Sequence, residues 1–210
     1  MVLVKFCGLT RRQDYHAAVA AGAAFTGFIF HPGSPRFLSP SAAAQLVEDP
    51  PPGPHRRVGV FVDATIEAIR GAAASARLDL IQLHGRESPE FARELGLPYW
   101  KAIRLREPGD LAILESHPTQ TFLIDAWHPD RHGGTGRALD LDLVAAALAR
   151  ARTLGKRLVV AGGLSAENLA AVLALRPWAV DLNSGVEVSP GIKDPAAIGA
   201  VMDLVGLQPI

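Results

Sequence analysis

The chain has 210 residues, of which 49% are hydrophobic and 6% aromatic, and its 21 basic residues balance its 21 acidic residues. A neutral chain with few aromatic residues is not expected to bind nucleic acid or an acidic membrane surface, and the hydrophobic fraction excludes intrinsic disorder. The single cysteine, Cys7, excludes an internal disulfide and a cysteine-cluster zinc site.

Short apolar runs alternate with Ala- and Leu-rich segments along the whole chain. The longest apolar stretch, 17–30, is too short to span a membrane, and the first residues do not form a signal-peptide pattern, so we expect a cytoplasmic protein. Eight apolar runs are typical of parallel strands that are buried on both faces. They are Val2–Phe6, Phe25–Phe30, Arg57–Phe61, Leu80–Leu83, Tyr99–Ile103, Thr121–Ile124, Arg157–Val160 and Ala179–Leu182.

The segments between these runs have apolar residues at helical spacing. Thr10 is the predicted cap of a helix that Gly22 ends, and Ser88 and Ser165 are predicted caps of two later helices. A weaker helix is expected after Gly109. The other predicted helices cover Ser41–Val47 with Pro40 at its start, Ala64–Ser75, Ser88–Leu95, Leu141–Thr153, Ala166–Leu175 and about 195–205.

Eight alternating strand and helix units predict a parallel sheet, which either stays open or closes into a barrel. The first strand is not followed by a G-x-G-x-x-G dinucleotide loop, and eight units is the number that closes a barrel. No linker or low-complexity stretch divides the chain. We therefore predict one domain over residues 1–210, a (β/α)8 TIM barrel near the minimum length of that fold.

The loops after the last two predicted strands are rich in glycine. Gly162 and Gly163 follow one strand, and Ser184 and Gly185 follow the next. Backbone amides in such loops can approach an anion closely, and phosphate sites in this fold are commonly built there. Tight turns alone would also use glycine, but two such loops at neighbouring strand ends favour a phosphate site.

Cys7 follows the first strand, where the active groups of a barrel are found. Lys5 points to the same side of that strand and is expected to favour the thiolate, so Cys7 is a candidate base or nucleophile; the alternative is a small core residue. Asp125 ends the sixth strand, and a carboxylate there has to be exposed or paired. With the phosphate loops between them, Cys7 and Asp125 could act as base and acid on one sugar.

Arg36 follows Pro35 in a long loop over the predicted site, and arginine can bind a carboxylate through two hydrogen bonds. Several histidines raise the question of a metal, but their spacings match no standard ligand set, so we expect no metal. These histidines are His31, His84, His128 and His132.

Several short motifs, each weak alone, occur in order along the chain. They are Lys5-Phe6-Cys7-Gly8-Leu9-Thr10, Ser34-Pro35-Arg36, Val58-Gly59-Val60-Phe61, Gln82-Leu83-His84-Gly85, Leu123-Ile124-Asp125, Gly133-Gly134-Thr135-Gly136, Ala161-Gly162-Gly163-Leu164, Ser184-Gly185-Val186-Glu187 and Pro190-Gly191-Ile192-Lys193-Asp194. Taken together and in this order, they resemble the phosphoribosylanthranilate isomerase family of tryptophan biosynthesis from end to end.

The resemblance implies an Amadori rearrangement of N-(5-phosphoribosyl)anthranilate to 1-(2-carboxyphenylamino)-1-deoxyribulose 5-phosphate, with no cofactor. By the family pattern Asp125 is the general acid, Cys7 the general base, and Arg36 holds the anthranilate carboxylate. Lys5, Gln82 and His84 are further substrate-binding candidates. The phosphate-binding candidates are Gly134, Thr135, Gly136, Gly162, Gly163, Ser184 and Gly185.

Some residues depart from the family pattern, and some readings stay open. Ala126-Trp127 follows the acid where a small polar residue is more common, Arg137 replaces a frequent lysine, and Asn183 replaces a frequent serine. The partner is expected to be a small phosphorylated molecule, and both a monomer and a homodimer remain possible. The rivals are the related histidine-pathway isomerase, a metal-dependent phosphosugar epimerase and a non-catalytic phosphate-binding barrel; Cys7 in place of an aspartate speaks against the first.

Overall fold

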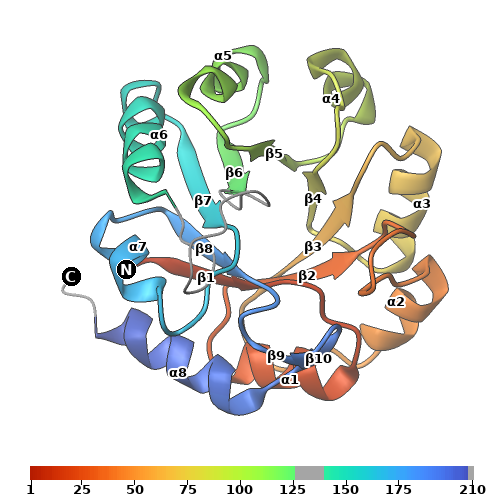
Figure 1. Cartoon of the computed structure of the whole chain (residues 1–210). Helices are drawn as coiled ribbons and strands as arrows, with labels where there is room; N and C mark the ends of the chain where they lie inside the picture. The colour runs from red at the N-terminus through yellow and green to blue at the C-terminus, as the bar shows by residue number, and fades with distance from the viewer. Residues whose placement is uncertain (126–139, 208–210) are drawn as a thin grey trace.

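Eight parallel strands form a closed ring that is surrounded by helices (Figure 1). The computed structural model describes residues 1–125 and 140–207. The strands of the ring are β1 (Leu3–Phe6), β2 (Phe25–Ile29), β3 (Arg56–Phe61), β4 (Leu80–Leu83), β5 (Tyr99–Arg104), β6 (Thr121–Asp125), β7 (Arg157–Ala161) and β8 (Ala179–Leu182).

The first and last strands of the ring are hydrogen-bonded to each other. Lys5 of β1 is in register with Asp181 of β8 on one side and with Phe25 of β2 on the other. Every strand follows its sequence neighbour around the ring, so the predicted barrel is confirmed and the open sheet is excluded. Each predicted strand is present, with ends that differ by at most one residue.

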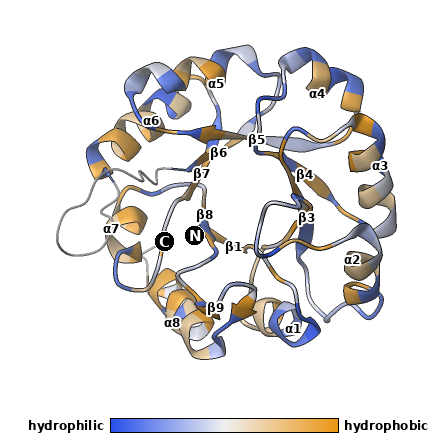
Figure 2. Ribbon diagram, turned by 45° about the vertical axis from the view of Figure 1, so that its right-hand side comes forward, coloured by the Kyte–Doolittle hydropathy of each residue, from blue (hydrophilic) through white to orange (hydrophobic). Residues whose placement is uncertain are grey.

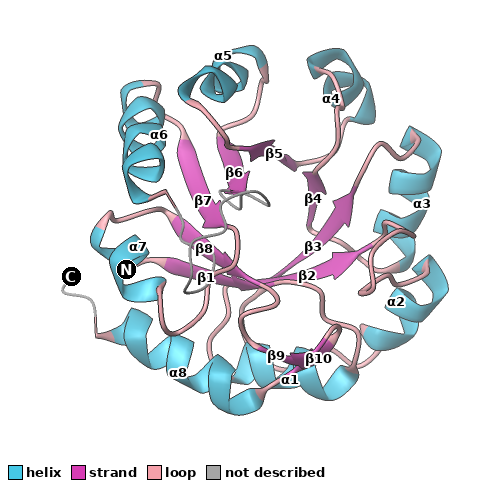
Figure 3. Cartoon of the chain, viewed as in Figure 1, coloured by secondary structure: helices cyan, strands magenta, loops and turns pink. Residues whose placement is uncertain are grey.

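Helices lie outside the ring, and a small hairpin lies beside α1 and α8 (Figure 3). The hairpin pairs β9 (Glu187–Ser189) with β10 (Ile192–Lys193) in antiparallel fashion, and the sequence analysis did not anticipate it. The helices are α1 (Arg12–Ala20), α2 (Pro40–Leu46), α3 (Ile66–Ser75), α4 (Pro89–Leu95), the 3₁₀ helix η1 (Pro108–Ala112), α5 (Ile113–Ser116), α6 (Leu141–Thr153), α7 (Leu169–Ala174) and α8 (Pro195–Gly206).

Two of the three predicted helix caps are wrong. Ser88 does cap α4 by accepting a hydrogen bond from the Phe91 amide. Thr10 instead donates its hydroxyl to the Gly191 carbonyl of the hairpin loop, over 2.6 Å, and α1 starts two residues later. Ser165 precedes α7 by four residues, because the Asn168 side chain bonds to the Ser165 amide and the Gly163 carbonyl and holds this segment in a turn.

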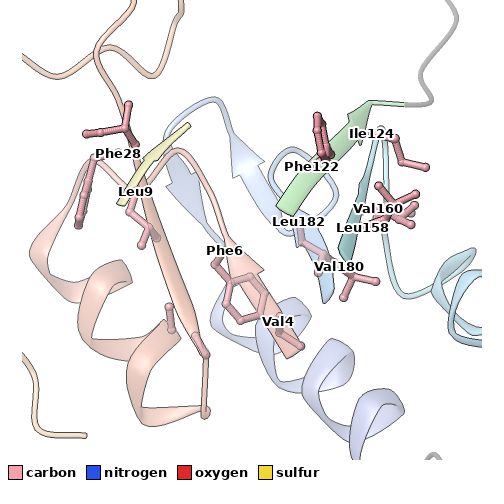
Figure 4. Packing of buried hydrophobic residues seen from close by; sticks show 14 of the residues in the cluster. Val4, Phe6, Leu9, Phe28, Phe122, Ile124, Leu158, Val160, Val180 and Leu182 are labelled. Carbon is pink, nitrogen blue, oxygen red and sulfur yellow. The ribbon is translucent and has the colours of Figure 1, made fainter. Parts of the chain in front are cut away.

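The outward side chains of the strands pack against the helices and form the larger core. Figure 4 shows members of this cluster from β1, β2, β6, β7 and β8, among them Val4, Phe6 and Phe122. The helices alternate between hydrophobic and hydrophilic residues in Figure 2, as expected for helices with one face on the sheet.

The inward side chains form a second, smaller cluster in the lower half of the barrel. Phe25, Trp100 and Trp178 are in contact there, with ring centroids 4.8 to 5.8 Å apart. This apolar cluster closes the end of the barrel at which the strands begin. The opposite end, where the strands finish, carries polar residues and is described next.

Candidate active site

Cys7 and Asp125 both stand at the carboxyl-terminal end of barrel strands. Asp125 is the last residue of β6, and Cys7 follows β1 directly. Between these strands the ring contains only β7 and β8, whose following loops hold the predicted phosphate-binding glycines. The topology therefore places both predicted catalytic residues and the phosphate loops along one arc of the barrel mouth.

Cys7 lies in a tight, nearly closed environment. Its side chain is buried against Ile29 and Val60. A Cβ added to Gly27 of β2 would lie 2.8 Å from Cys7 Sγ and 3.1 Å from Lys5 Cε. Only glycine at position 27 therefore leaves room for both side chains. Burial raises the pKa of the Cys7 thiol above its ordinary value, and the ammonium of Lys5 opposes this only in part.

Lys5 lies inside the barrel below Cys7, and it is fully buried. Its Nζ donates a hydrogen bond to Asp181 Oδ2 over 2.8 Å. Burial alone would lower the pKa of Lys5, but Asp181 and Cys7 together raise it above its ordinary value. The predicted direct contact between Lys5 and substrate does not fit this burial. Because Asp181 balances the positive charge of Lys5, Lys5 also stabilises the Cys7 thiolate less than expected.

Gln82 lies on the inner face of β4, and His84 directly follows the end of that strand. Gln82 is 1% exposed, so direct substrate contact, which was also predicted for this residue, does not fit either. Its Nε2 lies 2.9 Å from Nδ1 of His84, while Nε2 of His84 lies 3.8 Å from Oδ2 of Asp125. Gln82 thus orients His84, and the partly exposed His84 and Asp125 face each other at the mouth.

Two buried oxygens beneath the mouth lack a hydrogen-bond partner within the described part of the chain. They are Oδ1 of Asp181 and Oε1 of Gln82. An unsatisfied buried polar atom costs about 1–3 kcal/mol of stability. These buried polar groups under the mouth therefore lower the stability of the fold, and such groups are typical of a functional site.

Arg36 extends over the mouth from the loop between β2 and α2. A Cβ on Gly8, whose φ is +69°, would lie 2.6 Å from Arg36 Cδ, so glycine is needed where the two meet. Nε and Nη2 of Arg36 donate to the Glu187 carboxylate over 2.9 and 2.6 Å. In this structure the predicted carboxylate-binding arginine thus holds a carboxylate of the protein.

The glycine loops after β7 and β8 touch each other. Gly162 and Gly163 have φ values of +104° and +63°, which favour glycine. Ser165 and Gly185 form an isolated parallel bridge between the loops. A Cβ on Gly185 would lie 1.9 Å from the Leu164 carbonyl oxygen. Glycine at these positions is required by backbone approach, and the two loops form one continuous surface.

Three predicted phosphate-binding residues, Gly134, Thr135 and Gly136, lie outside the described residues. Over residues 1–125 and 140–207, no group of three or more His, Cys, Asp or Glu side chains is placed to hold a metal ion. Within the same ranges, no helix is both long and apolar enough to cross a membrane.

Sequence reasoning missed Gly27, Asp181, Glu187 and Lys193. A signal existed for Asp181, since it is a lone carboxylate within the apolar run Ala179–Leu182, and closure of the ring aligns it with Lys5. Glu187 and Lys193 lie within the quoted motifs, but only the hairpin turns both toward Arg36. Nothing local in the sequence marks Gly27 as the neighbour of Cys7.

Comparison with known proteins assigns the chain to a family. Residues 4–204 match the family model of N-(5'-phosphoribosyl)anthranilate (PRA) isomerase. The N-(5'-phosphoribosyl)anthranilate isomerase of Pelobacter propionicus is 41% identical over 199 residues, which cover 94% of this chain and 92% of that protein.

Solved structures of the same kind superpose closely on the barrel. Phosphoribosyl anthranilate isomerase from Thermus thermophilus is 39% identical, with a TM-score of 0.85 and 98% of both chains covered. A phosphoribosyl anthranilate isomerase in complex with reduced 1-(o-carboxyphenylamino)-1-deoxyribulose 5-phosphate is 34% identical, with a TM-score of 0.84 over 99% of this chain and all of that one. A structure of monomers generated from the dimeric enzyme of Thermotoga maritima is 33% identical, with a TM-score of 0.83 over 98% of this chain and 99% of that one. With its motifs, its closed barrel and these matches in agreement, the chain belongs to the PRA isomerase family.

Proposed function

We propose that the chain is an aldose-ketose isomerase that converts N-(5'-phosphoribosyl)anthranilate to the corresponding 1-deoxyribulose 5-phosphate in tryptophan biosynthesis. The observation that carries this proposal is the arrangement of the mouth. A buried thiol and a partly exposed carboxylate end strands β1 and β6, and two glycine loops lie between them. This arrangement suits a phosphorylated sugar that needs an acid at one position and a base at another.

In the proposed mechanism Asp125 acts first, as the general acid. It protonates the ring oxygen of the ribose, the C1–O bond breaks, and the anthranilate nitrogen supplies the electron pair of a Schiff base. His84 faces Asp125 at 3.8 Å and helps to orient its carboxyl group. No metal or cofactor takes part in these steps.

Cys7 acts second, as the general base. It removes the C2 proton, which the neighbouring iminium group acidifies, and the resulting enolamine then ketonises to the product. Because burial raises the pKa of Cys7, the thiolate is the minor form near neutral pH, and it is a strong, poorly solvated base when it forms.

The remaining residues bind the two anionic groups of the substrate. Arg36 holds the anthranilate carboxylate, and the amides and hydroxyl of the loops containing Gly162, Gly163, Ser184 and Gly185 hold the phosphate. Gly134, Thr135 and Gly136 are proposed to add to the phosphate site. Lys5 and Gln82 lie deeper in the barrel. Lys5 acts on the pKa of Cys7, and Gln82 orients His84.

The relative from Thermotoga maritima is described as dimeric, and both a monomer and a homodimer fit this chain. A cytoplasmic location stays a prediction.

The direct test is a turnover assay of the purified chain, which follows the disappearance of substrate and the appearance of product over time. Turnover of N-(5'-phosphoribosyl)anthranilate, and growth of a tryptophan-requiring strain that lacks this isomerase, are the expected results. Turnover of the histidine-pathway substrate alone would favour the related isomerase instead. Tight binding of the product analogue without turnover would favour a non-catalytic barrel.

A further inference from the structure

Three charged side chains form a cluster beside Cys7, in which two cations share one carboxylate. They are Arg36, Glu187 and Lys193, and their side chains are 16%, 3% and 0% exposed. Arg36 donates to both Glu187 oxygens, and Nζ of Lys193 donates to Glu187 Oε1 over 2.8 Å. We refer to these residues as the Arg36–Glu187–Lys193 cluster.

Lys193 is charged, as its hydrogen bonds show. Its Nζ donates to Glu187 Oε1, to the Asn183 carbonyl oxygen over 3.1 Å and to Asn183 Oδ1 over 3.0 Å. All three partners are acceptors, and only an ammonium has three N–H groups to give. Burial lowers the pKa of Lys193 and Glu187 opposes this shift.

Glu187 is charged as well. Its carboxylate accepts from Arg36 and Lys193 and also from the Gly191 amide, over 3.1 Å. Burial alone would raise the pKa of Glu187, but the hydrogen bonds from Arg36 and Lys193 hold it below its ordinary value.

The cluster therefore has one positive charge that no ion pair within residues 1–125 and 140–207 balances. Two cations share one anion, so the net charge is +1. The neighbouring ion pairs do not supply the missing anion, because Lys5 with Asp181 and Arg11 with Asp14 are each balanced. A buried net charge without a counter-ion is unfavourable, and a ligand carboxylate would complete the set.

Arg36 has a free edge on which such a carboxylate can bind. Glu187 occupies Nε and one N–H of Nη2. Nη1 donates to no acceptor among residues 1–125 and 140–207. The edge formed by Nη1 and the second N–H of Nη2 has the paired geometry that binds a carboxylate with two hydrogen bonds.

We propose that Lys193 is a positioning residue that makes Arg36 specific for a substrate carboxylate, by supplying the unbalanced positive charge of the cluster. This inference rests on the proposed function, which puts the anthranilate carboxylate at Arg36. Without Lys193, Arg36 and Glu187 form a neutral pair that attracts a second carboxylate weakly. With Lys193, Glu187 fixes the orientation of Arg36 without cancelling its charge.

The test compares two ligands that differ by one carboxylate. The first is reduced 1-(o-carboxyphenylamino)-1-deoxyribulose 5-phosphate, and the second is the same compound with a plain phenyl ring. In Lys193→Met, affinity for the first ligand should fall about 10- to 100-fold, the range of one charge-assisted interaction. Affinity for the second should stay within about twofold of the wild-type value.

Lys156→Met is the matched control, because it removes one lysine charge at the other end of the barrel. Lys156 Nζ donates to the Thr119 carbonyl, before strand β6. Its loss should leave both affinities unchanged.

A second variant restores the charge of the cluster. Glu187→Gln combined with Lys193→Met leaves Arg36 as the only charge, so the cluster again carries +1. This double variant should recover most of the affinity for the carboxylate ligand that Lys193→Met loses. A role of Lys193 in packing alone predicts a further loss instead, so recovery separates the two explanations.

Two results would overturn the inference: equal loss of both ligands in Lys193→Met, or unchanged affinity for the carboxylate ligand. If Lys193→Met does not fold, Lys193→Gln removes the same charge and keeps a polar group near Asn183, and the same outcomes apply. Wild-type protein that neither binds the first ligand nor turns over substrate would instead refute the proposed function, so the two failures are distinguishable.

Discussion

The interior of the barrel differs between its two ends. At the end where the strands begin, Phe25, Trp100 and Trp178 pack ring against ring. At the end where the strands finish, the inward side chains are polar and include Lys5 and Gln82. Two buried oxygens at this end lack a hydrogen-bond partner in the described part of the chain. One end therefore stabilises the fold, and the other gives up stability to position reactive groups.

The largest effect is expected at the end where the strands finish. There Cys7→Ala and Asp125→Asn each remove one proposed acid–base group. Each should lower kcat by about 10²–10⁴-fold, the usual contribution of such a group. The melting temperature should change little, because neither change opens a large cavity. Steady-state kinetics beside thermal denaturation checks this, and near-wild-type turnover in either variant would contradict the assigned roles.

Trp100→Ala, at the end where the strands begin, should have the opposite effect, with a large loss of stability and little change in kcat. Trp100 is 3% exposed and contacts Phe25 at 4.8 Å between ring centroids, so its truncation should cost about 3–5 kcal/mol of unfolding free energy. At a temperature where the variant stays folded, kcat should remain within a few-fold of wild type. Urea denaturation measures the first quantity. A drop in kcat as large as that of Cys7→Ala would show that the two ends are not separable.

Asp181→Asn tests the charge balance beneath the mouth. The carboxylate of Asp181 acts to raise the pKa of Cys7, and it also balances Lys5, whose ammonium acts to lower it. Removing the negative charge should therefore shift the pKa of Cys7 downward.

Thiolate absorbance measures this shift directly, because Cys7 is the only cysteine. The rise of kcat/KM with pH should move to lower pH by the same amount. An unchanged thiol titration would mean that Asp181 does not act on Cys7.

Gly185→Ala should have the smallest effect. Its Cβ would collide with the Leu164 carbonyl oxygen and push the two glycine loops apart, so KM should rise about tenfold, roughly 1.4 kcal/mol of lost phosphate binding, with a smaller change in kcat. Gly199→Ala in α8 is the matched control, because a Cβ there meets nothing within 4 Å. That change should leave KM unaltered and stabilise the helix slightly. Equal KM values in the two variants would show that Gly185 does not contribute to the phosphate site.

The fold could be predicted because every strand is an apolar run that ends at a polar or glycine-containing segment. The Thr121–Asp125 strand shows this, since its end was found from one carboxylate after four strand residues. The hairpin was missed because strands of three and two residues are too short to show a period of two.

The candidate site was only partly predictable, because its supporting residues meet through the closed ring. Asp181 is 176 positions from Lys5, and Glu187 is 151 positions from Arg36. Burial is likewise a property of the whole fold. It reversed the expected balance at Cys7, where burial outweighs Lys5.

The Lys5–Asp181 pair has a consequence for synthesis of the chain. A ribosome makes Lys5 176 residues before its counter-ion, Asp181. Throughout that interval the ammonium has no partner to enter the interior with, so it stays hydrated and β1 cannot take its final place. Docking of β1 onto β8 therefore waits until β8 has been made, and the growing chain holds no assembled thiol site until then.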